Sequence, residues 1–160
     1  MEKQFEIIRN TRRFLLNFIG DLTIDQLNEI PLGFNNNIIW NIAHMIAAQQ
    51  GICYLRGGLD LKIDQKMFQA YKPDTKPTGF VTSEEVKIIK QLLVSTIDQL
   101  ETDCKNNAFT NYTSWINRYG VQHNNIDDTI YFLIFHDGLH IGYIMPLNRL
   151  VKRTEMISTI

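Results

Sequence analysis

The chain has 160 residues, enough for one domain around a single hydrophobic core, and its 16 Lys and Arg nearly balance its 17 Asp and Glu. This balance argues against a nucleic-acid-binding protein, which needs a basic excess gathered on one face. Two cysteines, Cys53 and Cys104, are too few for a disulfide scaffold, so we expect two free thiols and a cytoplasmic protein.

The first helix is predicted over residues 3–19, where apolar residues recur at helical spacing. This amphipathic pattern differs from a signal peptide, and we find no run of about 18 apolar residues that would span a membrane. We therefore predict a single domain over residues 1–160 with no membrane partner. Three arginines in the first helix, Arg9, Arg12 and Arg13, are expected on its solvated face.

Local capping signals mark the helices that follow. A capping box at residues 23–26 predicts a short helix over residues 23–29. A run of three asparagines then offers N-caps for a second long helix over residues 37–56. A second capping box precedes a clean apolar stripe and predicts a third long helix over residues 83–101.

The last long helix is predicted over residues 127–151. Four long amphipathic segments without strand alternation favour an all-α four-helix bundle. Two long connections, residues 57–82 and 102–126, are able to cross the bundle, and the second has residues suited to a turn or a short hairpin. Simple up-down-up-down topology with short loops is therefore not expected.

Three of the four histidines fall on core-facing positions of these helices: His44, and the pair His136 and His140, which lie one helical turn apart. One interpretation is three buried imidazoles that are hydrogen-bonded within the core. The other is a shared divalent metal ion, which the paired spacing and the third histidine favour. Three protein ligands leave at least one coordination position open, as catalytic sites require.

The segment from His136 to His140 also resembles the zincin pattern H-E-x-x-H, with Asp137 in place of Glu. Aspartate is one methylene shorter and reaches a metal-activated water less well, and no further histidine follows. A metal-dependent hydrolase is therefore the weakest of the metal hypotheses. The Glu-x-x-His motifs of a di-iron bundle are absent from the sequence.

Trp40-x-x-x-His44, together with His136-Asp-Gly-Leu-His140-Ile-Gly-Tyr143, resembles the DinB family, from the first helix through about Val151. That family is similar to a wider group of metal-binding bundles, which includes YfiT-like proteins and thiol-dependent S-transferases. The resemblance implies a four-helix bundle with up-down-down-up connections and a divalent metal held by His44, His136 and His140. Zinc or nickel is the first expectation for this metal, and iron or manganese is the second. The run after His140 lacks a Gln that many members have, so the resemblance supports metal binding more strongly than any one activity.

Two functions are consistent with this resemblance. The first is a metal-dependent S-transferase that adds a low-molecular-weight thiol, such as bacillithiol, mycothiol or glutathione, to an electrophilic small molecule. Its candidate catalytic residues are Asp137, His123 and Tyr143. Asp137 either orients an imidazole or is a solvated or capping residue, His123 would act as an acid or base, and Tyr143 either contacts substrate or, as we favour, packs in the core. The second is a non-catalytic metal-binding or interaction protein, a homodimer formed by helix packing. Metal affinity is expected to fall below about pH 6, where imidazoles gain protons.

Overall fold

The computed structural model describes residues 1–158, and it confirms the predicted all-α class. Its four long helices are α1 (Glu2–Phe18), α3 (Ile38–Gln49), α5 (Ser83–Lys105) and α6 (Ile126–Ser158). The π-helical segment η1 (Gln50–Leu55) continues α3. The smaller elements are the short helices α2 (Ile24–Asn28) and α4 (Gln65–Tyr71) and the antiparallel strands β1 (Trp115–Ile116) and β2 (Gln122–His123).

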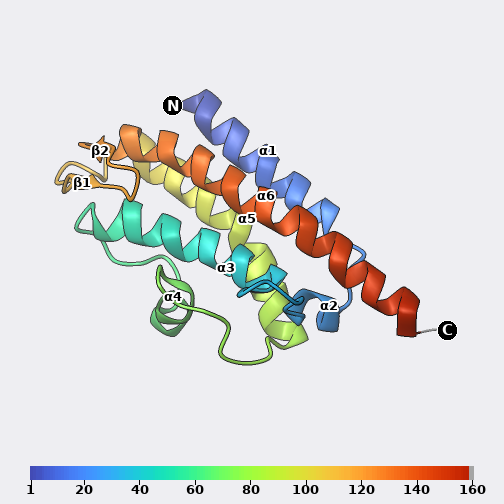
Figure 1. The fold of residues 1–160 in the computed structure, drawn as a ribbon. Helices are drawn as coiled ribbons and strands as arrows, with labels where there is room; N and C mark the ends of the chain where they lie inside the picture. The colour runs from blue at the N-terminus through green and yellow to red at the C-terminus, as the bar shows by residue number, and fades with distance from the viewer. Residues whose placement is uncertain (159–160) are drawn as a thin grey trace.

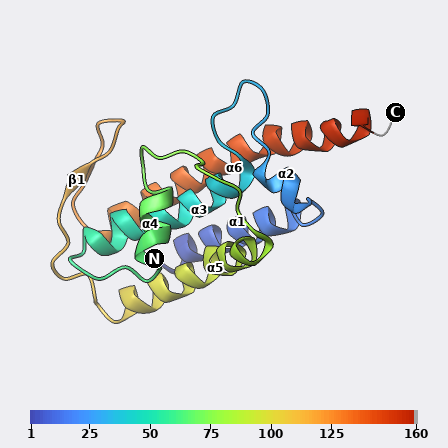
Figure 2. The same cartoon turned by 90° about the horizontal axis from the view of Figure 1, so that it is seen from below.

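Each long helix packs against two of the others. Both α1 and α3 contact α5 and α6. Figure 1 shows α1 and α6 beginning at one end of the molecule and α3 and α5 beginning at the other. Because α3 and α5 run in the same direction, the chain between them returns along the length of the helices, with α4 packed against α3 (Figure 2). The connection from α5 to α6 contains the hairpin and stays at one end of the bundle (Figure 1). Of the two connections that were expected to cross the bundle, only residues 57–82 do so.

Side-chain caps mark the starts of α2, α3 and α5. Thr23 and Thr82 each form a complete capping box with the residue three positions later. Asn37 accepts the backbone N–H of Trp40 at 2.8 Å and starts α3. Helix α6 continues through Pro146 to Ser158, beyond its predicted end at residue 151. The two final residues of the predicted domain lie outside the described residues.

A buried polar layer divides the core into two apolar clusters. The cluster nearer α2 has residues from α1, α3, α5 and α6 that include Leu15, Met45, Leu93 and Ile144. The cluster nearer the hairpin includes Ile8, Tyr54, Leu100 and Leu133. Between them lie four buried polar residues, one from each long helix, and we call them the polar layer: Arg12, Gln49, Thr96 and Asp137.

Arg12 links all four long helices through this layer. Its Nε and Nη2 donate to the two carboxylate oxygens of Asp137, at 2.7 and 3.3 Å. Its Nη1 donates to Gln49 Oε1 and to the carbonyl of Leu93, both at 2.9 Å. Gln49 Nε2 in turn donates to the Thr96 carbonyl at 2.9 Å. The expectation that Arg12 lies on a solvated face is therefore wrong, because the charge is fully buried and its partners come from the other three helices.

Helix α6 has a segment, Ile126–Arg153, that is long and apolar enough to qualify as a membrane span by length and composition. This finding differs from the expectation drawn from the sequence, which found no such run. Ile130, Leu133, Ile144 and Leu147 of this segment are buried against the other helices. About a third of its most apolar stretch, 33%, is buried in the core, and the core helix of a bundle can meet the same criterion.

Arg12→Met should lower the free energy of unfolding by about 3–5 kcal/mol, because Asp137 is left buried without its partner. Urea denaturation of the purified variant measures this loss. Arg13→Met, a matched change at an exposed arginine, should stay within about 0.5 kcal/mol of the wild type. The double variant Arg12→Met/Asp137→Leu should recover much of the loss, and a double variant as unstable as Arg12→Met would contradict this account.

Candidate metal centre

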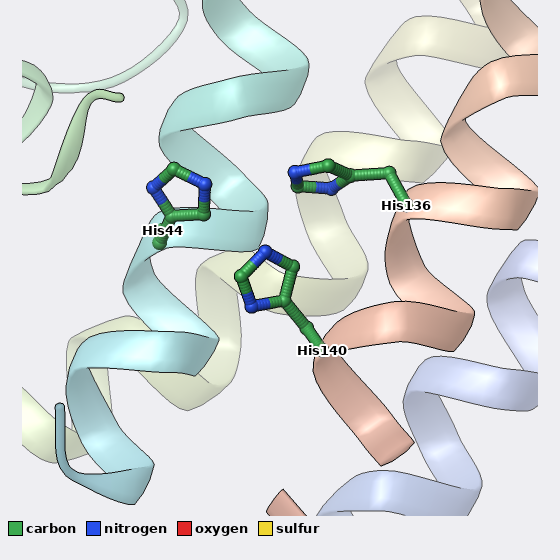
Figure 3. A group of neighbouring side chains, drawn as sticks. All are labelled: His44, His136 and His140. Atoms are coloured by element: carbon green, nitrogen blue, oxygen red, sulfur yellow. The ribbon is translucent and has the colours of Figure 1, made fainter. Parts of the chain in front are cut away.

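Three histidine side chains converge between two helices. His44 extends from α3, and His136 and His140 extend from α6, with all three rings turned toward one another (Figure 3). The ring centroids are 5.4 Å apart for His44 and His136, 4.8 Å for His44 and His140, and 4.6 Å for His136 and His140. One nitrogen of each ring lies within 4.8 Å of the others, so the group can hold a metal ion. The structure therefore brings together the three residues that the sequence singled out.

The rotation of α6 about its axis directs its two histidines toward α3. Asp137 is held in the polar layer by Arg12, which fixes one side of α6 against α1. His136 and His140 lie one turn apart on the neighbouring side, where α6 contacts α3. His44 is buried on α3 and stacks on Trp40 at a centroid distance of 4.8 Å and an angle of 12°.

Hydrogen bonds fix the protonation of two of the three rings. His44 Nδ1 lies 2.8 Å from the carbonyl oxygen of Tyr71, which can only accept, so Nδ1 carries the proton. Asn41 Nδ2 donates to the Asn37 carbonyl at 2.8 Å, which orients the Asn41 amide. Its Oδ1 then faces His140 Nδ1 at 2.9 Å, and this nitrogen must also be the donor. In the neutral form of each ring the proton therefore sits on Nδ1, which leaves the Nε2 lone pair free to bind a metal.

The third ring has no such anchor. His136 Nδ1 is buried and has no hydrogen-bond partner. An unpaired polar atom in an apolar site is costly, and each such atom in a folded protein needs an explanation. Three neutral imidazoles, two of them already held in the metal-binding tautomer, form a donor set that suits a divalent ion such as Zn²⁺ or Ni²⁺. The residues present therefore fit the metal that the sequence predicts.

Burial keeps these rings unprotonated. It lowers the pKa of His136 to about 2 and of His140 to about 3, and it lowers the pKa of His44 as well. The positive charge of Arg118 acts in the same direction on all three rings. These lowered pKa values favour neutral rings at neutral pH, and the expected fall of metal affinity below about pH 6 stays a prediction.

The three candidate catalytic residues are held in other contacts. Asp137 contacts neither an imidazole nor solvent, because its carboxylate is bound by Arg12, and burial raises its pKa while Arg12 opposes that rise. His123 is buried, and its Nε2 lies 3.0 Å from Asn117 Nδ2 and its Nδ1 3.2 Å from the Asp128 carbonyl. Tyr143 is partly buried and packs edge-on against Phe34 at 5.4 Å.

Neither cysteine is positioned to supply a reactive thiol. Cys53 and Cys104 are both unpaired and buried, in agreement with the two free thiols expected from the sequence. Burial raises the pKa of the Cys104 thiol to about 12 and raises that of Cys53 well above its ordinary value. Both thiols therefore stay protonated at neutral pH, and a thiol that reacts at this protein must come from outside the chain.

Sequence reasoning missed the groups that orient the histidines. Asn41 lies three positions before His44, on the same face of the helix. This position was the only feature of the sequence that pointed to its contact with the histidines. The Tyr71 carbonyl gives no signal, because any residue supplies a backbone carbonyl. Arg118 lies in the hairpin turn and acts electrostatically on the site, although it is far from the histidines in sequence.

Comparison with known protein families supports the same assignment. The family model described as the DinB superfamily matches residues 7–144, which include His44, His136 and His140. The chain therefore belongs to the DinB superfamily. A comparison with curated proteins finds no match.

His140→Ala should weaken metal binding strongly, because it removes one of three donors and leaves a gap between the other two. His123→Ala should leave metal affinity nearly unchanged, because His123 contacts Asn117 and Asp128 rather than the three-histidine group. Equilibrium titration of both variants with Zn²⁺ or Ni²⁺ separates the two effects. Wild-type affinity in His140→Ala, or loss of the metal in His123→Ala, would make the proposed ligand set wrong.

The metal-free protein should lose stability as pH falls below about 6.5, the ordinary imidazole value. In this range the unfolded chain binds protons at His136 and His140 that the folded chain, with lowered pKa values, does not. Denaturation curves between pH 7.5 and 4.5 should therefore give a steeper decline for the wild type than for His136→Gln/His140→Gln. Parallel declines in the two proteins would contradict the lowered pKa values.

Proposed function

We propose that this protein binds a divalent metal through His44, His136 and His140. With this metal it acts as an S-transferase that adds a thiol to electrophilic small molecules. The observation that carries the proposal is the fixed tautomer of His44 and His140, which leaves each Nε2 lone pair available. Membership of the DinB superfamily and the closeness of the three ring nitrogens support it. Zinc or nickel fits three imidazole donors best, with iron or manganese as alternatives.

A bound divalent metal would supply a Lewis acid that favours the thiolate form of an incoming thiol. The chain's own part is to hold the donors in place. Asn41 and the Tyr71 carbonyl orient two rings, and stacking on Trp40 restrains His44 further. Burial keeps the rings neutral, so that they bind metal rather than protons at neutral pH.

The reactive thiol in this proposal is an external low-molecular-weight compound, since both cysteines of the chain are buried and protonated. Its S–H bond would break and release the proton to solvent while the sulfur forms a bond to a carbon of the electrophile. The electron pair displaced from that carbon would depart with a leaving group or, in an addition, take up a proton from solvent. His123, Asp137 and Tyr143 have no step in this proposal, because each is held in other contacts.

We also propose that the four long helices form a DinB-like bundle with up-down-down-up topology. The shared direction of α1 and α6, opposite to that of α3 and α5, supports this arrangement (Figure 1). The contacts of α1 and α3 with both α5 and α6 support it as well. We retain the cytoplasm as the proposed location of the protein, and we propose that no membrane or nucleic acid is its partner.

A second candidate function is a non-catalytic metal-binding or interaction protein that forms a homodimer. The outer face of α6 favours this candidate, since Tyr131, Phe135 and Leu139 follow one another at intervals of four residues and are all exposed. Helices of two copies could pack through such a face. This function would retain the metal without a reaction at the site.

Addition of Zn²⁺ or Ni²⁺ should raise the melting temperature by roughly 5–10 °C at one hundred times the dissociation constant, because only the folded chain assembles the three donors. A low-molecular-weight thiol should raise it further only when metal is present, and metal-loaded protein should speed the loss of thiol in the presence of a chromogenic electrophile. His140→Ala is the matched control and should give neither response. A metal response without any thiol response would favour the second function.

A further inference from the structure

The turn between β1 and β2 presents an arginine from a rigid backbone. Asn117 Oδ1 accepts the backbone N–H groups of Tyr119 at 2.9 Å and Val121 at 3.0 Å. The Asn117 N–H donates to the Val121 carbonyl at 3.0 Å, and its Nδ2 donates to His123 Nε2 at 3.0 Å. Arg118 lies within this turn and is exposed. Two buried residues, Asn117 and His123, therefore hold the backbone that carries Arg118.

This turn adjoins the three-histidine site. His123 packs edge-on against Phe132 at a centroid distance of 5.2 Å, and Phe132 lies 5.9 Å from His136. Strand β2 contacts α6, the helix that supplies two of the three histidines. The positive charge of Arg118 is a smaller cause, after burial, of the lowered pKa of His44, His136 and His140. A ligand at the three histidines would therefore lie within the electrostatic reach of Arg118.

The neighbouring acidic groups do not offset this positive charge. Asp137 is already paired with Arg12. Asp74 raises the pKa of His44 but is not among the causes of the pKa shifts of His136 and His140. Among the side chains that the structure describes, Arg118 forms no ion pair with an acidic residue. A divalent cation on three neutral donors, with the unpaired guanidinium of Arg118 on the adjoining turn, leaves this region with a net positive charge. An anionic ligand is the partner that balances this charge.

We propose that Arg118 binds a carboxylate of the incoming thiol and thereby selects thiols that carry an acidic group. This proposal rests on the proposed function, because it assumes that the thiol sulfur lies at the three-histidine site. A guanidinium suits the role, since its paired N–H donors match the two oxygens of a carboxylate. The substrate class is then a low-molecular-weight thiol with a carboxylate a few bonds from sulfur.

Binding of two thiols of equal chain length to the metal-loaded protein tests this proposal. Isothermal titration should show that 3-mercaptopropionate binds about tenfold more tightly than 3-mercapto-1-propanol, the ratio expected for one hydrogen-bonded charge pair. Arg118→Gln should abolish this preference while binding metal at least as tightly as the wild type. Arg13→Gln removes a different exposed arginine and should keep the preference.

The possible failures are distinguishable. Equal binding of the two thiols to the metal-loaded wild type overturns the role of Arg118 and leaves the proposed function standing. A preference that survives in Arg118→Gln assigns the carboxylate to another cation and also overturns the role of Arg118. A wild type that binds no metal, or that binds metal but neither thiol, overturns the proposed S-transferase and this inference with it.

Discussion

The buried pair of Arg12 and Asp137 is the interaction on which the rest of the arrangement depends. Burying two charges is expensive, and the cost is recovered only where the geometry is good and the remaining donors are satisfied. Here the guanidinium reaches a carboxylate, a side-chain amide and a backbone carbonyl, and these partners come from three different helices. An apolar seam tolerates sliding and rotation of one helix on another, whereas this layer has one register in which every polar group finds a partner.

The position of α6 that this ion pair fixes also determines how the three histidines are arranged. With Asp137 fixed toward α1, the histidines on either side of it in sequence face α3 and meet His44 (Figure 3). Asn41 and the Tyr71 carbonyl then settle which nitrogen of two rings carries the proton. The three-histidine group is therefore largely organised by the protein's own contacts, at the cost of one buried His136 nitrogen without a partner. Such preorganisation favours tight binding because little order remains to be imposed.

The long helices and α2 were predictable because their signals are local, in apolar stripes and in the caps at Thr23 for α2, Asn37 for α3 and Thr82 for α5. Helix α4 was missed because only Phe68 of its seven residues is buried, which leaves no periodic pattern. The π-helical turn of η1 has no composition signal of its own. The three histidines were predictable from their spacing. The burial of Arg12 and its pairing with Asp137 were not, because the two residues lie 125 positions apart and no helical period relates them.

The distance along the chain between the two members of the polar layer's ion pair has a consequence for synthesis on the ribosome. Arg12 emerges 125 residues before Asp137, which lies on α6. Until then the arginine lacks its counterion, His44 lacks both companion histidines, and the apolar faces that α6 will cover remain open to solvent. A chain that is released early can complete neither the bundle nor the donor set, so it stays accessible to cellular proteases. An ion that needs all three histidines could consequently bind only chains that include α6.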